Sequence, residues 1–120
     1  MIRIKRIYDD YSLEDGRRIL VDRIWPRGIS REKAMIDEWM KDIAPSTDLR
    51  KWFSHDPGKW EKFREEYRKE LCRSGDIARL RNGGNITLLY SARDREHNNA
   101  IVIREILEDY ENFVNQCREG

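Results

Sequence analysis

The stretch ITLLYSARDREHNNA, residues 86–100, decides the fold class because a strand, a polar turn and the start of a helix follow one another directly. Residues 86–90 are apolar, with β-branched and aromatic members, which is typical of a buried strand. A helix is expected from about Glu96, because apolar residues then recur along one stripe. The members of this stripe are Ala100, Ile103, Ile106, Leu107, Tyr110, Phe113 and Val114.

Two more strands are expected before this unit. Residues 19–24 begin with the apolar run Ile19-Leu20-Val21, which fits a central strand buried on both faces. A helix-sized connection separates residues 19–24 from residues 86–90, so we expect these two strands to be parallel neighbours. Residues 2–8 alternate between apolar and polar side chains, as a strand does. Because the next connection is short, the direction of this first strand relative to residues 19–24 stays open.

Helix signals occupy the remaining segments. Ser30 is an expected N-cap, and helical spacing continues to Ile43, just before Pro45. A short helix is expected after Ser46 or Thr47. The pair Asp56-Pro57 fits an N-cap followed by the first helical position.

The helix after Pro57 has the apolar stripe Trp60, Phe63, Tyr67 and Leu71 and is expected to end at Gly75. A further short helix over residues 76–81 is stopped by Gly83 and Gly84. The sequence contains neither an internal repeat nor a linker. We therefore predict an α/β fold: a single compact domain over residues 1–120, with a small, mostly parallel β-sheet covered by helices.

Composition limits the function. The chain has 24 Lys and Arg against 23 Asp and Glu, so overall charge does not indicate a strongly basic nucleic-acid binder. No signal-peptide pattern and no membrane-span pattern is present, and Cys72 and Cys117 form no CxxC pair. We expect a reduced cytoplasmic protein with no membrane partner, no disulfide framework, no metal site and no cofactor. The oligomeric state is not predicted.

Two polar turns, residues 22–28 and 91–99, follow the expected parallel strands. In an open α/β sheet, ligands usually bind at the carboxyl ends of the strands. Helix N-termini and arginine side chains at this edge favour an anion such as phosphate or carboxylate. The predicted ligand-binding residues are Asp22, Arg23, Trp25, Arg27, Ser91, Arg93 and Asn98.

Three nearby groups are able to move a proton. Asp94 and His97 lie three residues apart, so both are expected to face the same crevice, and His55 is the next candidate. Each also has a structural interpretation: Asp94 as a helix cap and the histidines as packed side chains. Asp22 and Arg23 equally fit a structural pairing with each other or with a neighbour at the strand end, and Trp25 fits the core better than a ligand platform.

Three stretches, LVDRIWPRG, APSTDLRKWFSHDP and TLLYSARDREHNNA, together resemble the uncharacterised YeaO-like family, a branch of a larger family of domains of unknown function. The resemblance extends from Ile4 to about Leu107 and implies a compact α/β domain without an established reaction. The family motifs fall on Asp22, Arg23, Trp25, Pro26, Arg27, Ser46, Trp52, His55, Pro57, Ser91, Arg93, Asp94, His97 and Asn98.

The leading functional hypothesis is an anion- or phosphate-binding crevice for a small anionic or nucleotide-like ligand, with enzyme activity left open. The alternatives are a nucleic-acid-binding accessory protein, or a protein-interaction module. An enclosed crevice favours the small ligand. An exposed basic stripe over Arg17, Arg18 and Lys33 favours nucleic acid.

Overall fold

Four parallel strands form one sheet at the centre of the computed structural model, which describes residues 1–119. The strands are β1 (Ile2–Arg6), β2 (Arg17–Leu20), β3 (Glu38–Trp39) and β4 (Ile86–Tyr90), and their order in the sheet is β1–β4–β2–β3. Ile86 of β4 lies opposite both Ile2 and Arg17. The predicted parallel pairing of the second and last strands is confirmed, and β1 runs parallel to both.

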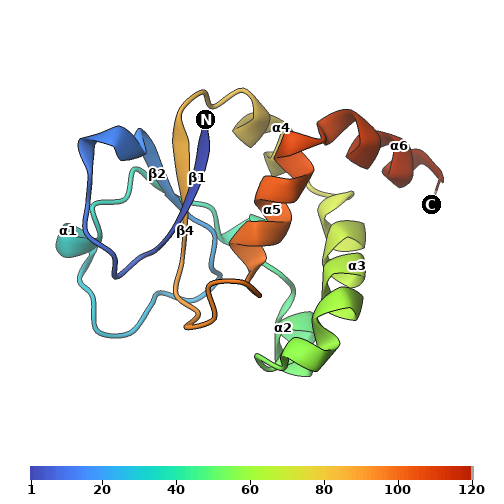
Figure 1. The fold of residues 1–120 in the computed structure, drawn as a ribbon, viewed down its shortest axis with the longest axis horizontal. Helices are drawn as coiled ribbons and strands as arrows, with labels where there is room; N and C mark the ends of the chain where they lie inside the picture. The colour runs from blue at the N-terminus through green and yellow to red at the C-terminus, as the bar shows by residue number, and fades with distance from the viewer. Residues whose placement is uncertain (120) are drawn as a thin grey trace.

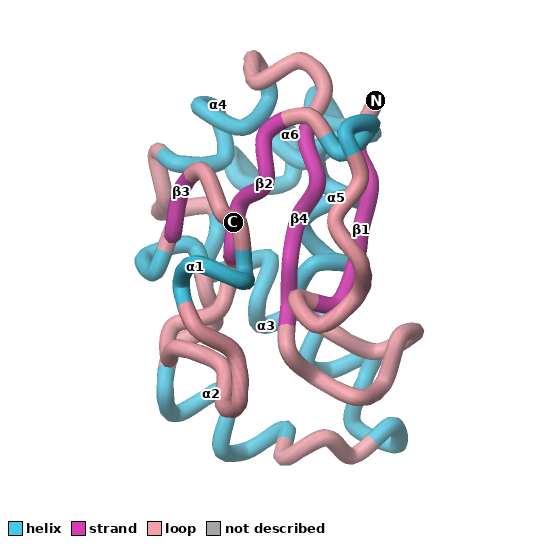
Figure 2. The backbone as a smooth tube through the Cα atoms, turned by 90° about the vertical axis from the view of Figure 1, so that its left-hand side faces the viewer, coloured by secondary structure: helices cyan, strands magenta, loops and turns pink. Residues whose placement is uncertain are grey.

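The two faces of the sheet are covered differently (Figures 1 and 2). Helices α3, α4 and α5 cover one face, and α1 with its flanking loops covers the other. The helices are α1 (Arg31–Ala34), α2 (Thr47–Phe53), α3 (Trp60–Leu71), α4 (Asp76–Arg81), α5 (Asn99–Glu108) and α6 (Tyr110–Glu119). Short 3₁₀ helices occur at Leu13–Asp15, Lys41–Ile43 and Pro57–Lys59. The α/β fold class is therefore confirmed.

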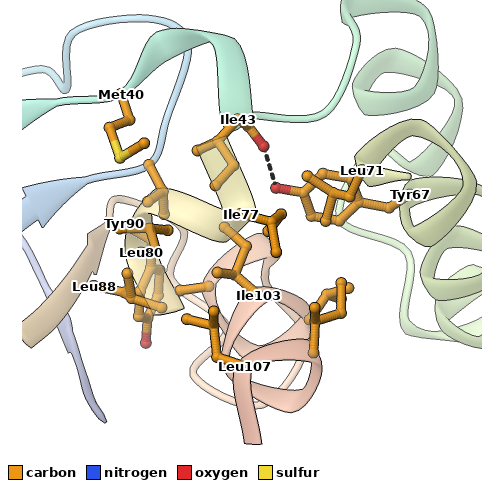
Figure 3. Close-up of a cluster of buried hydrophobic side chains, with 14 of the residues drawn as sticks. Met40, Ile43, Tyr67, Leu71, Ile77, Leu80, Leu88, Tyr90, Ile103 and Leu107 are labelled. Carbon is orange, nitrogen blue, oxygen red and sulfur yellow. Dashed lines mark hydrogen bonds between the residues drawn. The ribbon is translucent and has the colours of Figure 1, made fainter. Parts of the chain in front are cut away.

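Alternating side chains of the strands supply two hydrophobic clusters. Ile19 and Leu88 point into the larger cluster, between the sheet and α3, α4 and α5, whereas Leu20 and Leu89 point into the smaller cluster beside α1. Figure 3 shows α5 and α4 meeting in the larger cluster. There the Tyr67 hydroxyl donates a hydrogen bond of 2.6 Å to the carbonyl oxygen of Ile43, which satisfies a buried polar atom.

The segment from Ser30 to Ala44 differs from the sequence prediction of one long helix. Helix α1 ends after one turn at Met35, whose φ of 49° is left-handed, and strand β3 and a 3₁₀ turn follow. The Arg18 guanidinium explains the stop, because it donates to the carbonyl oxygens of Ala34 and Met35, each at 3.0 Å. These carbonyls would otherwise accept bonds from the next helical turn.

The last helix also differs from the prediction. It begins at Asn99 rather than near Glu96, and Asp109 separates α5 from α6. The Asp94 carboxylate binds the backbone N–H groups of Glu96 and His97, which holds this segment as a turn before the helix. The apolar stripe indicated helix correctly but did not mark this interruption.

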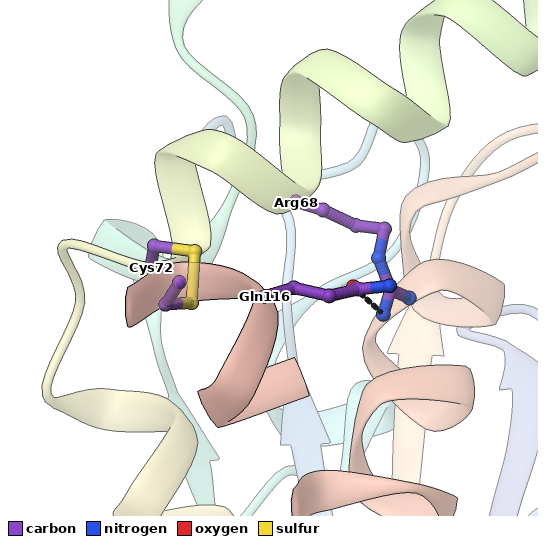
Figure 4. Close-up of a disulfide and its surroundings, with 4 residues drawn as sticks. Arg68, Cys72 and Gln116 are labelled. Atoms are coloured by element: carbon purple, nitrogen blue, oxygen red, sulfur yellow. Dashed lines mark hydrogen bonds between the residues drawn. A yellow bond between two sulfur atoms is a disulfide. The ribbon is translucent and has the colours of Figure 1, made fainter. Parts of the chain in front are cut away.

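A disulfide joins Cys72, at the end of α3, to Cys117 in α6, so the expectation of two reduced cysteines is wrong (Figure 4). The two residues are 45 positions apart in sequence. Their contact depends on how α6 packs against α3, and neither cysteine belongs to a local motif that would reveal it. The bond attaches the C-terminal helix to the body of the domain.

A buried ion pair lies at the amino edge of the sheet. Arg18 is only 2% exposed, and its guanidinium pairs with the buried carboxylate of Asp15. Lys5 approaches the same carboxylate at 3.0 Å. No helix within residues 1–119 has both the length and the apolar character needed to cross a membrane.

Candidate functional site

A cavity of about 170 Å³ lies at the carboxyl ends of β2 and β4. Residues just after these strands, Asp22 and Ser91 among them, line one side of it, and residues of the turn before α5 adjoin them. Helix α2 and the following loop complete the wall at the same end of the sheet (Figure 1). The complete lining is Asp22, Arg23, Ile24, Ala44, Pro45, Arg50, Phe53, His55, Phe63, Ser91, Ala92, His97, Asn98 and Asn99.

Asp22 is the carboxylate of the cavity. One of its oxygens accepts hydrogen bonds from the Ser91 backbone N–H at 3.0 Å and from the Ser91 hydroxyl at 2.6 Å. The other accepts from the Asn99 side chain at 3.2 Å. Burial raises the pKa of Asp22 above its usual range, although these hydrogen bonds and the charge of Arg50 oppose the rise. Asp22 therefore holds the ends of β2 and β4 and the start of α5 together.

Two arginines contribute positive charge to the lining. Arg23 donates to the carbonyl oxygen of Ala44 at 3.1 Å and to that of Pro45 at 3.4 Å, which fixes its side chain along the wall. Arg50 is exposed on α2, and its side chain makes no hydrogen bond or ion pair with any of residues 1–119. All N–H donors of the Arg50 guanidinium are thus free to bind a ligand, whereas two nitrogens of the Arg23 guanidinium already donate to backbone carbonyls.

His97 lines the cavity and is hydrogen-bonded to Asp94, which was expected to face the same crevice but lies outside the lining. Asp94 Oδ2 lies 2.9 Å from His97 Nδ1, while Oδ1 accepts the turn N–H groups of Glu96 and His97. The backbone N–H of Glu96, with further help from His97, lowers the pKa of Asp94 despite the opposing effect of burial. The imidazole packs edge-to-face against Trp60, with 5.2 Å between ring centroids.

Neighbouring asparagines fix the start of α5. Asn98 is 3% exposed; its Oδ1 accepts from the Ile101 N–H at 3.1 Å, and its Nδ2 donates to the Asp94 carbonyl at 3.0 Å. Asn99 donates to the carbonyl oxygen of Val21 at 2.7 Å. The helix cap is therefore Asn98 and not Asp94, which caps only the preceding turn.

Three of the predicted ligand-binding residues lie outside this lining: Trp25, Arg27 and Arg93. Trp25 packs in the smaller cluster, where its ring meets Trp39 edge-to-face and its N–H donates to Ile29 at 2.8 Å. Arg27 and Arg93 are exposed. His55, whose φ of 57° is left-handed, does line the cavity, but its side chain is exposed.

Arg50, Phe53 and Phe63 line the cavity although the sequence did not single them out as ligand-binding residues. Arg50 lies inside the stretch APSTDLRKWFSHDP, which belongs to the family motifs. The stretch was interpreted only as a short helix, so Arg50 was not considered as a ligand contact. Phe53 and Phe63 stack at 4.3 Å and form an apolar part of the wall. Their position depends on the packing of α2 against α3, which sequence spacing does not report.

The fold and the cavity define a small parallel α/β domain with polar strand ends facing an arginine-bearing helix. The chain belongs to the family DUF488-N3i, described as the inactive DUF488-N3 subclade, which matches residues 1–118. The family match and the similarity of the chain to the relatives given next confirm the resemblance to YeaO-like proteins.

The chain is 44% identical over 113 residues to the uncharacterized protein YeaO of Escherichia coli, covering 88% of this chain and 96% of that protein. It is 37% identical over 109 residues to the uncharacterized proteins Mb3100c of Mycobacterium bovis and Rv3073c of Mycobacterium tuberculosis, covering 88% of this chain and 92% of each. No solved structure matches the chain significantly.

Proposed function

We propose that this protein binds a small anionic molecule in the cavity at the carboxyl edge of its sheet. The observation that carries the proposal is that two arginines, Arg23 and Arg50, line the same cavity and that the Arg50 side chain is unpaired by any of residues 1–119. Guanidinium forks match the geometry of phosphate and carboxylate. The stacked rings of Phe53 and Phe63 suit an apolar or planar part of the same ligand.

Binding without turnover fits the chemistry of the lining better than catalysis. The Ser91 hydroxyl donates to Asp22 and is therefore not activated by a histidine as a nucleophile. Both cysteines are held in the disulfide, away from the cavity lining. The family description as inactive points in the same direction. His97 and His55 then serve as ligand contacts, and Asp94 positions His97.

The nucleic-acid alternative loses its main support in the arrangement of the basic residues. Arg18 is buried and paired with Asp15, and Arg17 pairs with Glu38 at 2.8 Å. The stripe that would attract a phosphate backbone is therefore not free on this part of the surface. Lys33, the third residue of that stripe, is exposed but does not form a stripe by itself.

Isothermal titration with inorganic phosphate and with small carboxylates at two salt concentrations tests the proposal. Arg50→Ala is expected to weaken binding about tenfold, the usual worth of a charge-assisted hydrogen bond. Lys51→Ala is the matched control, since Lys51 is exposed on the same helix and does not line the cavity. Equal losses in both variants would mean that binding reflects diffuse surface charge, and the proposal would be wrong.

A further inference from the structure

We propose that the ligand is a small acid that also carries a hydroxyl or N–H donor, and that His97 Nε2 accepts a hydrogen bond from this donor. The inference rests on the proposed function and deepens it by naming the ligand class. It assigns Asp94 the part of a positioning residue, because Asp94 determines which ring nitrogen of His97 carries the proton.

Asp94 is able to fix the tautomer of His97. An ionised carboxylate only accepts hydrogen bonds, so the 2.9 Å contact with Asp94 Oδ2 requires the proton on Nδ1. The lowered pKa of Asp94 keeps this carboxylate ionised at neutral pH. In the neutral ring Nε2 is then an acceptor, and within residues 1–119 it has no hydrogen-bond partner.

The imidazole ring is also held in place. Its side chain is 29% exposed, lines the cavity and contacts the Trp60 ring. Flipping the ring about its bond to Cβ would break the hydrogen bond between Nδ1 and Asp94. His97 therefore presents a fixed acceptor to whatever occupies the cavity.

The distribution of charge places the acidic group of the ligand elsewhere. Asp22 accepts hydrogen bonds from Asn99 and Ser91, so its electron-rich oxygens repel an anion. The guanidinium groups of Arg23 and Arg50 attract the anion instead. A ligand that satisfies both parts of the lining has an acidic group at the arginines and a donor at His97. An anion without a hydrogen-bond donor would leave His97 Nε2 hydrogen-bonded only to water.

Two matched pairs of compounds test this reading by titration calorimetry. Mandelate and phenylacetate share a carboxylate and a ring and differ in one hydroxyl, and α-hydroxybenzylphosphonate and benzylphosphonate form the same pair for a phosphorus acid. We expect the hydroxyl compound of at least one pair to bind about tenfold more tightly, as one hydrogen bond predicts. The comparison between the pairs distinguishes a carboxylate from a phosphate-like group.

Two variants locate this preference. His97→Phe keeps a ring against Trp60 but removes Nε2, so mandelate and phenylacetate should bind this variant with equal affinity. Asp94→Asn presents an amide N–H to Nδ1 and should move the ring proton to Nε2, which turns Nε2 from an acceptor into a donor. Glu96→Gln is the control, because this exposed side chain does not line the cavity.

Nitrogen-15 NMR of the histidine rings gives a readout without any ligand. When the His97 ring of the unmodified protein is neutral, its Nδ1 should carry the proton and its Nε2 should not, and Asp94→Asn should exchange the two signals. A bare Nδ1 in the unmodified protein overturns the inference, as does equal affinity within both pairs. If acids bind in an Arg50-dependent manner without discrimination, only this inference fails. If none of the four acids binds, the proposed function fails with it.

Discussion

At the residue scale, Arg18 connects three parts of the structure. Its guanidinium pairs with Asp15 and also binds the carbonyl oxygens of Ala34 and Met35. It therefore satisfies a buried charge and ends α1 at the same time. A buried pair of this kind makes the protein sensitive to the loss of either partner, because the remaining charge stays buried.

Arg18→Met is expected to lower the free energy of unfolding by about 3 kcal/mol, since Asp15 then keeps only Lys5 as a charged partner. The measurement is urea denaturation at neutral pH. Arg17→Met is the matched control: Arg17 is exposed, and its pair with Glu38 is worth less than about 1 kcal/mol. Similar losses for the two variants would show that the Asp15 pair is not effectively buried.

Asp22 should give the opposite dependence on pH from a normal surface carboxylate. Burial raises the pKa of Asp22 above 3.8, so the unfolded chain loses this proton first as the pH rises. The Asp22 contribution to stability is therefore fully present below about pH 3.8 and is lost as the pH rises through the folded pKa. Asp22→Asn removes this loss, so unfolding free energies measured from pH 3 to 7 should favour the variant increasingly as pH rises. A constant difference between the two curves contradicts the burial of an ionised Asp22.

At the scale of elements, the start of α5 depends on one side chain. Asn98 caps the helix and also holds the Asp94 carbonyl in the preceding turn. Asn98→Ala should therefore lower the unfolding free energy by about 1–2 kcal/mol, as measured by thermal and urea unfolding. Asn115→Ala, an exposed change in the middle of α6, should leave it nearly unchanged. If Asn98→Ala left the unfolding free energy unchanged, packing alone would determine where α5 starts.

The sequence predicted those elements whose signal is local. Residues 86–90 have the apolar character of a buried strand, and Asp56-Pro57 has the chemistry of a helix start; both were located correctly. The spacing between Ala34 and Ile43 looked helical because short elements happen to bury residues at similar intervals. The helix ends at Ala34 because the side chain of Arg18, which is distant in sequence, binds the carbonyl oxygens of Ala34 and Met35.

The same distinction applies to the candidate site. The cavity lining contains five of the residues singled out from the sequence, because residues that follow parallel strands meet at one edge of a sheet: Asp22, Arg23, Ser91, His97 and Asn98. Arg50 and Phe63 come from helices whose placement depends on packing around the larger cluster, so no local pattern indicated them. Arg27 and Arg93 belong to the same turns but are exposed and lie outside this lining.

At the scale of the whole molecule, the Cys72–Cys117 bond closes a loop of 45 residues. Replacing both cysteines with serine is expected to lower the unfolding free energy by about 3–4 kcal/mol, because the unfolded chain gains freedom. Dithiothreitol should shift the melting temperature of the unmodified protein toward that of the double variant and should not shift the variant itself. Insensitivity of both proteins to the reductant would show that the bond does not form in the isolated protein.

The order of the sheet has a consequence for synthesis on the ribosome. β4, formed by residues 86–90, lies between β1 and β2, which are not neighbours of each other. A nascent chain that ends before β4 therefore cannot pair its first strand with its second, and both keep open hydrogen-bonding edges. The sheet must assemble late, through contacts between residues more than eighty positions apart, which slows folding. Stalled or truncated chains of this protein are accordingly the forms most exposed to aggregation and to capture by chaperones.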